Sequence, residues 1–215
     1  MIGSASLVAG SSYLDPTTNS PIINPRFNHT MTLKINENRN AQKYTWQIQL
    51  GRIAWAFGEF IFRLIPRPLF ETRCWILRLF GAKIGRRVHL YNSVKITFPW
   101  LLEIGDDTAI GERARIYNLG KITIGARVTV SQGSHLCAGS HDYRSPTMDL
   151  QKLPITIADD AWICADAFIG PAVNIGNGAI VGARAVAMKN VPAWTIVVGN
   201  PATHIKKRSL RVESE

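Results

Sequence analysis

An aliphatic side chain recurs at six-residue spacing through most of the second half of the chain, with two extra residues at one position in each set of three. The positions are Ile84, Leu90, Ile96, Ile104, Ile110, Ile116, Ile124, Val130, Leu136, Ile157, Ile163, Ile169, Ile175, Val181 and Ala187. A period of six fits neither an amphipathic helix nor a long strand with alternating faces. It favours very short strands joined by turns, three of which form one coil of a triangular prism.

The first three coils begin at Ile84, Ile104 and Ile124, so each coil takes 20 residues. We expect the aliphatic positions to fill the core, a role that needs no chemistry. Glycine often follows them, as at Gly85 and Gly105. We expect these glycines to adopt turn conformations that a Cβ would resist.

The first 82 residues lack this pattern. Residues 1–40 are rich in Ser, Thr, Asn and Pro, which predicts a mobile polar tail. Residues 41–82 form a basic, amphipathic segment with two expected helices, separated at Pro66 and Pro68. It either packs on the prism with solvated charges or contacts an anionic membrane surface. We expect no signal peptide, because no basic stretch precedes an apolar run at the N-terminus, and no membrane-spanning helix, because no apolar run is long enough.

Charge and cysteine content narrow the class further. The net charge of +10 favours an anionic partner, but the basic residues are not interleaved with a nucleic-acid-binding motif, so we expect no nucleic acid. Cys74, Cys137 and Cys164 are far apart and match no zinc spacing or disulfide framework. This pattern predicts a cytoplasmic protein.

The repeat is interrupted between Leu136 and Ile157, in the stretch that contains His141 and Asp142. His141 comes one residue before the next expected core position, which predicts a place at a prism corner. Residues 142–154 then form a loop that projects from the prism and walls a cleft. By pattern alone, His141 is either a catalyst or a corner residue. Asp142 either fixes the imidazole tautomer or starts a turn.

The segments "IGDDTAIGERARI", "ITIGARVTV" and "VNIGNGAIVGARAVAMKNVPAWTIVVGNPA" resemble hexapeptide-repeat acyltransferases. With "LRLFGAKIGRRV", "CAGSHD" and "VVGNPA", the chain resembles the colanic acid biosynthesis and exopolysaccharide O-acetyltransferase group over about residues 43–210. The resemblance implies an all-β, left-handed parallel β-helix, which we place at 83–198. We expect a C-terminal turn and short helix at 199–215.

The resemblance also implies an activity. Members form homotrimers that hold acetyl-CoA in a groove between neighbouring prisms, and a histidine acts as general base on an acceptor hydroxyl. His141 is the matching residue, and a neutral imidazole suits proton removal near neutral pH. We therefore expect an acetyl-CoA-dependent O-acetyltransferase that uses no metal. Its acceptor would be the hydroxyl of a sugar or lipid-linked saccharide, and peripheral membrane contact would place it at the inner face of the membrane.

Further residues follow from the resemblance and from their positions. Candidates for contact with acetyl-CoA are Trp162, Ala165, Ala183, Lys189 and Lys206, with Lys207 or Arg208 as additional partners for phosphate. Candidates for contact with the acceptor are Tyr117, Asn118, Asp142 and Trp162.

The sequence alone leaves two alternatives open and disfavours a third. The acceptor could be a non-sugar hydroxyl, such as that of serine or an antibiotic. The prism could also be a non-enzymatic scaffold. A metal-dependent hydratase is disfavoured, because His135 and His141 have no evident third histidine partner.

Overall fold

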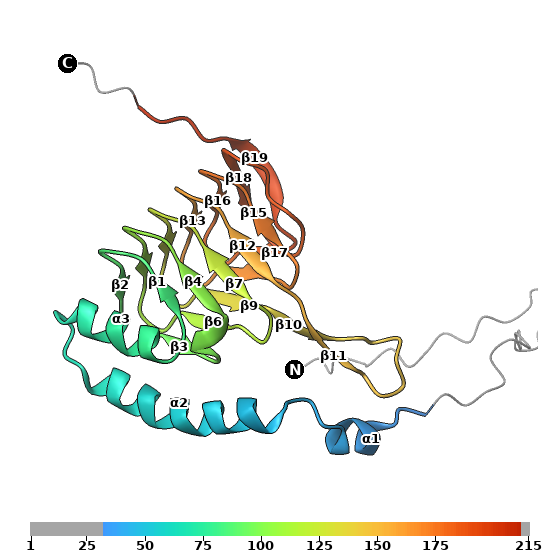
Figure 1. Cartoon of the computed structure of the whole chain (residues 1–215). Helices are drawn as coiled ribbons and strands as arrows, with labels where there is room; N and C mark the ends of the chain where they lie inside the picture. The colour runs from blue at the N-terminus through green and yellow to red at the C-terminus, as the bar shows by residue number, and fades with distance from the viewer. Residues whose placement is uncertain (1–31, 212–215) are drawn as a thin grey trace, which may run out of the picture.

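The computed structural model describes residues 32–211, most of which form a parallel β-solenoid with three flat faces (Figure 1). The first face holds β1 (Lys83–Ile84), β4 (Leu102–Ile104), β7 (Ile122–Ile124), β12 (Ile155–Ile157) and β15 (Asn174–Ile175). The second holds β2 (His89–Leu90), β5 (Ala109–Ile110), β8 (Thr129–Val130), β13 (Trp162–Ile163), β16 (Ile180–Val181), β18 (Thr195–Val198) and β19 (Thr203–Lys207). The third holds β3 (Lys95–Ile96), β6 (Arg115–Tyr117), β9 (His135–Cys137), β14 (Phe168–Ile169) and β17 (Val186–Ala187). The predicted all-β class and β-helix architecture are confirmed.

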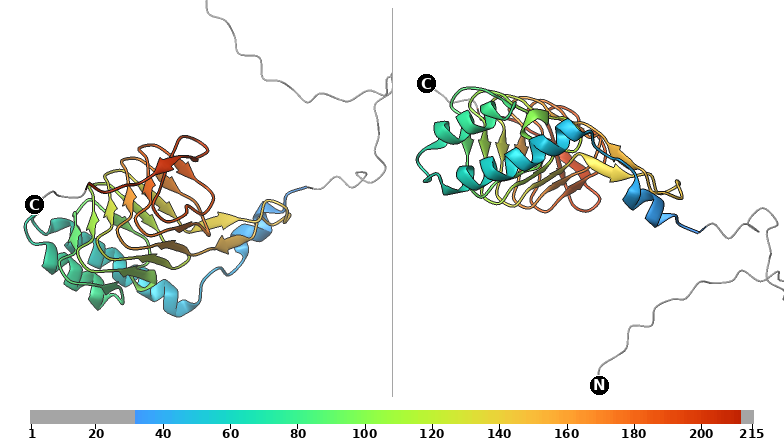
Figure 2. Two further views of the ribbon diagram at one scale, coloured as in Figure 1. Left: turned by 90° about the horizontal axis from the view of Figure 1, so that it is seen from above. Right: turned by 60° about the horizontal axis from the view of Figure 1, so that its bottom comes forward.

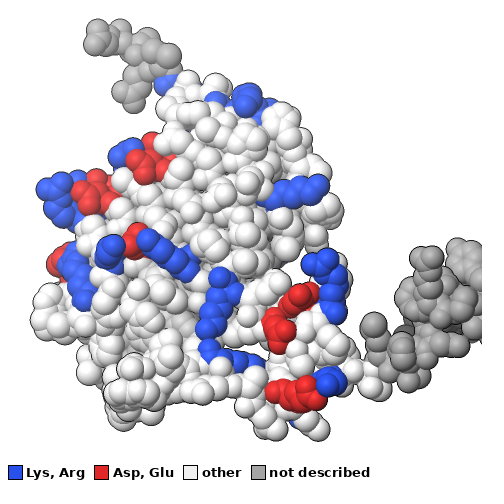
Figure 3. Space-filling model, turned by 45° about the vertical axis from the view of Figure 1, so that its right-hand side comes forward, with Lys and Arg blue, Asp and Glu red and all other residues white. Residues whose placement is uncertain are grey.

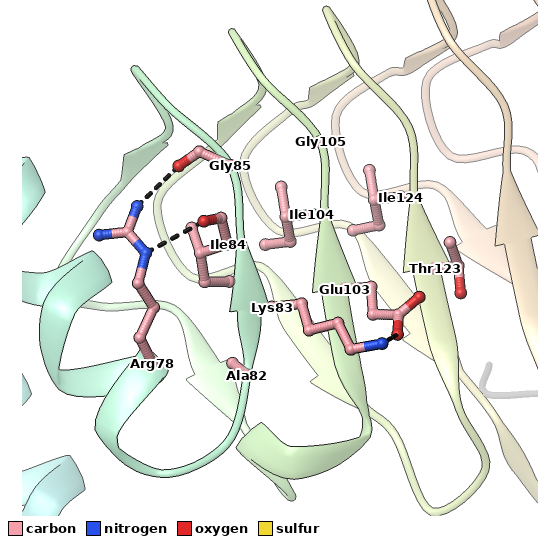
Figure 4. Close-up of a pocket in the computed structure, with 10 residues that line it drawn as sticks. All are labelled: Arg78, Ala82, Lys83, Ile84, Gly85, Glu103, Ile104, Gly105, Thr123 and Ile124. Atoms are coloured by element: carbon pink, nitrogen blue, oxygen red, sulfur yellow. Dashed lines mark hydrogen bonds and ion pairs between the residues drawn. The ribbon is translucent and has the colours of Figure 1, made fainter.

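The six-residue repeat forms the core of the prism. All fifteen repeat positions are buried, and Ile84, at 9% exposure, is the least covered. Ile84, Ile104 and Ile124 stack on one another along the first face (Figure 4). Burial of these side chains in three columns supplies the hydrophobic stabilisation of a very narrow domain.

The glycines that follow the core positions have a different role from the one predicted. Gly105 does not have a positive φ, but a Cβ there would lie 2.6 Å from the backbone nitrogen of Ala126 in the next coil. The left-handed backbone conformation falls two residues later, at Asp107 and, in the next coil, Arg127. Glycine is therefore required by the close approach of stacked coils.

Two of the helices cover the first coil, which is one of the two alternatives that the sequence left open. α2 (Trp46–Leu64) and α3 (Phe70–Leu79) lie side by side across it (Figure 2). Trp55 of α2 donates its indole N–H to the carbonyl of Ile96, 2.9 Å away. Arg78 of α3 donates to the carbonyls of Ile84 and Gly85 (Figure 4). A short 3-10 turn, η2 (Pro99–Leu101), connects β3 to β4. No helix within residues 32–211 is long and apolar enough to cross a membrane.

Two boundary predictions are wrong. The expected tail 1–40 includes α1 (Ile35–Asn40), which contacts a hairpin described below through Asn38; residues 1–31 lie outside the described part. The expected C-terminal helix in 199–215 is absent from the described residues up to 211. Thr203–Lys207 instead form β19, which pairs antiparallel with β18 and covers the exposed edge of the second face.

Candidate active site

His141 lies outside the prism, on a hairpin that replaces the predicted loop 142–154. β10 (Gly139–His141) and β11 (Leu150–Lys152) pair antiparallel, so the excursion begins at Gly139 and projects between the third and first faces (Figure 1). His141 faces Leu150 across the hairpin, and its side chain is exposed. An exposed imidazole on a projecting arm is placed to meet a bound substrate.

The imidazole of His141 has a fixed tautomer. Its Nδ1 lies 2.6 Å from the carbonyl oxygen of Met148. Because a carbonyl only accepts hydrogen bonds, Nδ1 must carry the proton and donate it. In the neutral ring, the other nitrogen, Nε2, then carries the lone pair and can accept a proton from a hydroxyl.

The tip of the hairpin holds the Met148 carbonyl in place. The Met148 N–H donates to the carbonyl of Ser145 (2.9 Å), and Met148 has a φ of 47°. The Asp149 carboxylate accepts from the hydroxyls of Thr147 (2.7 Å) and Ser145 (2.9 Å). These two hydrogen bonds, that from Thr147 first, lower the pKa of Asp149. The tip is thus a closed network of short-range hydrogen bonds.

Asp142 starts the turn and does not hold the imidazole. Its carboxylate accepts a hydrogen bond from the backbone N–H of Arg144 (3.0 Å) and lies 3.8 Å from the Arg144 side chain. A carboxylate that accepts from the second residue along the chain is a common turn-initiating arrangement. Met148, and not Asp142, therefore provides the partner for Nδ1 of His141.

α1 also contacts the Met148 carbonyl. Asn38 donates its amide to the carbonyls of Met148 (2.9 Å) and Thr147, and Lys43 donates to the Asn38 side-chain oxygen (2.7 Å). The backbone N–H of Lys34 donates to Pro146 (2.8 Å). Nothing in the sequence marks Asn38, because it lies more than 100 residues from the segment it contacts.

A pocket of about 490 Å³ lies on the third face at the base of the hairpin. Lys95, Arg115, Tyr117, His135 and Cys137 contribute to its lining. Cys137 precedes His141 by four residues, so the pocket and the imidazole belong to one continuous stretch of chain. Tyr117 is 40% exposed here, where an acceptor could contact it.

Asn118 does not line this pocket, contrary to prediction. It is fully buried and its side chain bonds to the backbone of the preceding coil. Its oxygen accepts from the N–H groups of Thr97 (3.2 Å) and Phe98 (2.9 Å), and its amide donates to the Phe98 carbonyl (2.6 Å). These bonds hold the amide inside the solenoid, and its complete burial leaves no surface for an acceptor to contact.

The candidates for contact with acetyl-CoA divide into two groups. Trp162 is 44% exposed on the second face and donates to the hydroxyl of Ser131 (2.9 Å). Ala165 and Ala183 lie in the turns after β13 and β16, in adjacent coils connected by the bond from the Arg184 N–H to the Ala165 carbonyl (2.9 Å). These three residues share one side of the prism, and His141 extends from another.

The second group lies at the C-terminal end of the solenoid. Lys189 lines a pocket of about 300 Å³ together with His204 and Lys207. Lys206 does not line it. The guanidinium of Arg208 donates hydrogen bonds to the carbonyls of Asp160 (2.8 Å) and Gly178 (3.0 Å).

Two missed residues, Lys95 and Arg115, have a visible sequence signal. They lie 20 residues apart, one before a core position, and His135 follows at the same interval. The coil length therefore predicts that these residues form one outward column. Within residues 32–211, no three His, Cys, Asp or Glu side chains are grouped so that they could hold a metal ion.

One curated relative and several solved structures are similar to this chain. No protein-family model matches the chain. WcaF of Escherichia coli K12, named as a colanic acid biosynthesis acetyltransferase, is 45% identical over 161 residues, which cover 75% of this chain and 87% of WcaF.

Solved structures share the fold. The hexapeptide-repeat acetyltransferase VCA0836 of Vibrio cholerae has a TM-score of 0.71 at 25% identity, over 77% of this chain and 94% of that one. A galactoside acetyltransferase in complex with coenzyme A has a TM-score of 0.73 at 20% identity, over 85% and 92%. With a short repeat that forms a β-solenoid and a close relative over three quarters of its length, this chain belongs to the hexapeptide-repeat acetyltransferases, in the group of WcaF.

Proposed function

We propose that this acetyltransferase transfers the acetyl group of acetyl-CoA to a sugar hydroxyl in exopolysaccharide biosynthesis, with His141 as general base. The observation that carries the proposal is the hydrogen bond from Nδ1 of His141 to Met148, which leaves Nε2 as the proton acceptor. WcaF is named for colanic acid biosynthesis, and a VCA0836 structure contains acetyl-CoA. Both support this substrate pair.

The chemistry needs one proton transfer and one acyl transfer. Nε2 of His141 removes the hydroxyl proton as the acceptor oxygen attacks the thioester carbon. The carbon–sulfur bond then breaks, and the proton leaves with the CoA thiolate as free thiol. Base catalysis of this kind contributes about 10²–10⁴-fold, and the binding of both substrates in one cleft supplies much of the remaining acceleration.

The enzyme works as a homotrimer in this proposal. His141 extends on the hairpin between the third and first faces, whereas Trp162, Ala165 and Ala183 lie on or beside the second face. When a neighbouring copy packs alongside, its Trp162, Ala165 and Ala183 lie next to the hairpin that carries His141 in the first copy. One acetyl-CoA site then forms between each pair of prisms.

The enzyme also works in the cytoplasm at an anionic membrane surface. One side of α2 carries large apolar residues that are each more than half exposed: Trp46, Leu50, Ile53, Phe57, Phe60, Ile61 and Leu64. Their spacing of mostly three or four residues aligns them along one stripe, while Trp55 and Phe62 face the prism. Arg52 on the same helix bonds the neutral side chain of Gln49 (2.8 Å), so its charge suits negatively charged headgroups, whereas Arg63 is paired with Glu59 (2.6 Å).

Sedimentation with vesicles tests this membrane contact. We expect the protein to bind vesicles that contain phosphatidylglycerol and to lose this binding in Phe57→Ser/Phe60→Ser, since both side chains are exposed and their loss removes no core packing. Loss of the trimer in this variant, with vesicle binding retained, would instead assign the apolar stripe to contact between copies.

An acceptor panel tests the activity. Release of CoA is followed with nucleotide sugars, oligosaccharides, serine and chloramphenicol as acceptors, and the products are identified by mass spectrometry. The proposal expects an O-acetylated sugar. Transfer to chloramphenicol or serine alone would refute the sugar substrate, and the absence of transfer to every acceptor, with acetyl-CoA bound, would support a scaffold.

A further inference from the structure

Two cationic side chains are stacked directly on one another on the third face. Lys95 pairs in register with Arg115, and Arg115 pairs with His135. Each lies one residue before a core position, so its side chain points away from the prism. Neighbouring strands are about 4.8 Å apart, which places the two charges in adjacent positions of one column.

The rest of the solenoid avoids such an arrangement. In the corresponding column of the first face, Lys83 stacks on Glu103, whose carboxylate lies 2.7 Å from Lys83 (Figure 4). The same carboxylate lies 2.9 Å from Lys121. At one corner, Arg87 lies against Asp107 and Arg127 against Asp160. Several Lys and Arg side chains on the visible surface lie directly beside Asp or Glu side chains (Figure 3).

Lys95 and Arg115 have no such compensation. Among residues 32–211, neither side chain forms an ion pair or a hydrogen bond to a protein group. Like charges directly opposite each other in a sheet are destabilising. An anion bound from outside the chain would offset the repulsion between these two cationic side chains.

The surroundings of the pair suit a charged saccharide. Both residues line the 490 Å³ pocket together with Tyr117 and His135. Burial, followed by the charge of Arg115, lowers the pKa of His135, so its ring is a neutral hydrogen-bonding group at pH 7. The half-exposed ring of Tyr117 offers an apolar surface for a sugar.

We propose that Lys95 and Arg115 bind an anionic group, a phosphate or carboxylate, carried by the saccharide acceptor. The proposal rests on the proposed function and adds the charge class of the acceptor. His135, the neighbour of Arg115, precedes His141 by six residues, a span of at most about 20 Å. An oligosaccharide can therefore place its anionic group on the pair and a hydroxyl at the imidazole.

Equilibrium binding of matched sugars tests the pair without requiring turnover. Methyl glucoside, methyl glucuronoside and glucose 1-phosphate are titrated into the wild type and into Arg115→Gln, Lys95→Gln and the control Lys83→Gln. We expect the wild type to prefer the two anionic probes, and each of the first two variants to weaken them about tenfold. Lys83→Gln should leave binding unchanged, because Lys83 lies in another column.

Kinetics with acetyl-CoA separate the two sources of anion, since the cofactor also carries phosphates. The KM for acetyl-CoA should stay within twofold in Arg115→Gln, and the melting temperature without ligand should not fall, because a repulsion is removed. Equal binding of neutral and anionic probes, a raised KM for acetyl-CoA, or a change in oligomer size would each overturn the proposal. Intact anion binding with no acetyl transfer would refute the proposed function and leave this site standing.

Discussion

The Nδ1 atom of His141 lies 2.6 Å from the carbonyl oxygen of Met148, across the hairpin that β10 and β11 form. This contact fixes which ring nitrogen is free, and the enzyme's own backbone provides it. The same carbonyl accepts a hydrogen bond from Asn38 of α1 (2.9 Å). The orientation of the base thus depends on a helix that precedes the solenoid.

Replacement of Asn38 tests whether α1 positions the base. Asn38→Ala removes one hydrogen-bond donor from the Met148 carbonyl. The lost hydrogen bond contributes about 1 kcal/mol to holding this carbonyl, and with it the imidazole, in place, so kcat should fall roughly fivefold with an unchanged KM for acetyl-CoA. Asn36→Ala on the same helix is the control, and Asn38→Gln should recover part of the rate. A rise in KM with kcat unchanged would mean that Asn38 contacts substrate instead.

Mixed trimers test the shared site. We expect His141→Gln and Trp162→Ala to be inactive or weak as separate trimers. After denaturation and refolding together, some interfaces combine an intact His141 with an intact Trp162 from the neighbour, so activity should return to about a quarter of the wild-type value on statistical grounds. No recovery after confirmed mixing would place both residues in the site of one protomer.

Arg73 should be among the most sensitive positions for stability. It is fully buried in α3 and its guanidinium donates to the carbonyls of Leu90 (2.6 Å), Pro66 (2.8 Å) and Arg67 (2.8 Å). Arg73→Met leaves these carbonyls without a donor, so we expect a loss of roughly 3 kcal/mol in the free energy of unfolding. Urea denaturation measures it, with the exposed Arg113→Met expected within about 0.5 kcal/mol of the wild type.

The stability should also depend on pH through His135. Burial and Arg115 lower the pKa of His135 below its ordinary 6.5, so the folded state binds a proton less readily than the unfolded state. The free energy of unfolding is therefore unaffected by His135 above pH 6.5. It decreases as the pH falls below 6.5, by at most about 1.4 kcal/mol per pH unit, because the unfolded state takes up the proton first. Urea denaturation between pH 5 and 8 should show a flatter dependence in His135→Gln; an equal slope in both proteins would contradict this assignment.

The sequence predicted the solenoid because its six-residue period is local and repeated. A core position such as Ile110 recurs with its neighbours often enough to define the strands and the coil length. The sequence did not predict the burial of Asn118, because a polar residue two positions after a core residue is also compatible with an exposed site. Its burial depends on the backbone of Phe98, one coil away.

The parts of the site that the sequence did not predict depend on distant contacts. The contact between Asn38 and Met148 joins segments 110 residues apart, and no periodicity connects them. The column of Lys95 and Arg115, by contrast, follows from the 20-residue coil and could have been found. The helix expected after residue 199 was wrong because pairing with β18 outweighs any local preference there.

The central claim is that Nε2 of His141 takes the acceptor's proton. Single-turnover release of CoA from acetyl-CoA, with an acceptor found in the panel, should be about 10²–10⁴-fold slower in His141→Gln, with the dissociation constant for acetyl-CoA within twofold of the wild type. His89→Gln, an exposed histidine on strand β2 of the first coil, should react at the wild-type rate. A wild-type rate in His141→Gln would contradict the account.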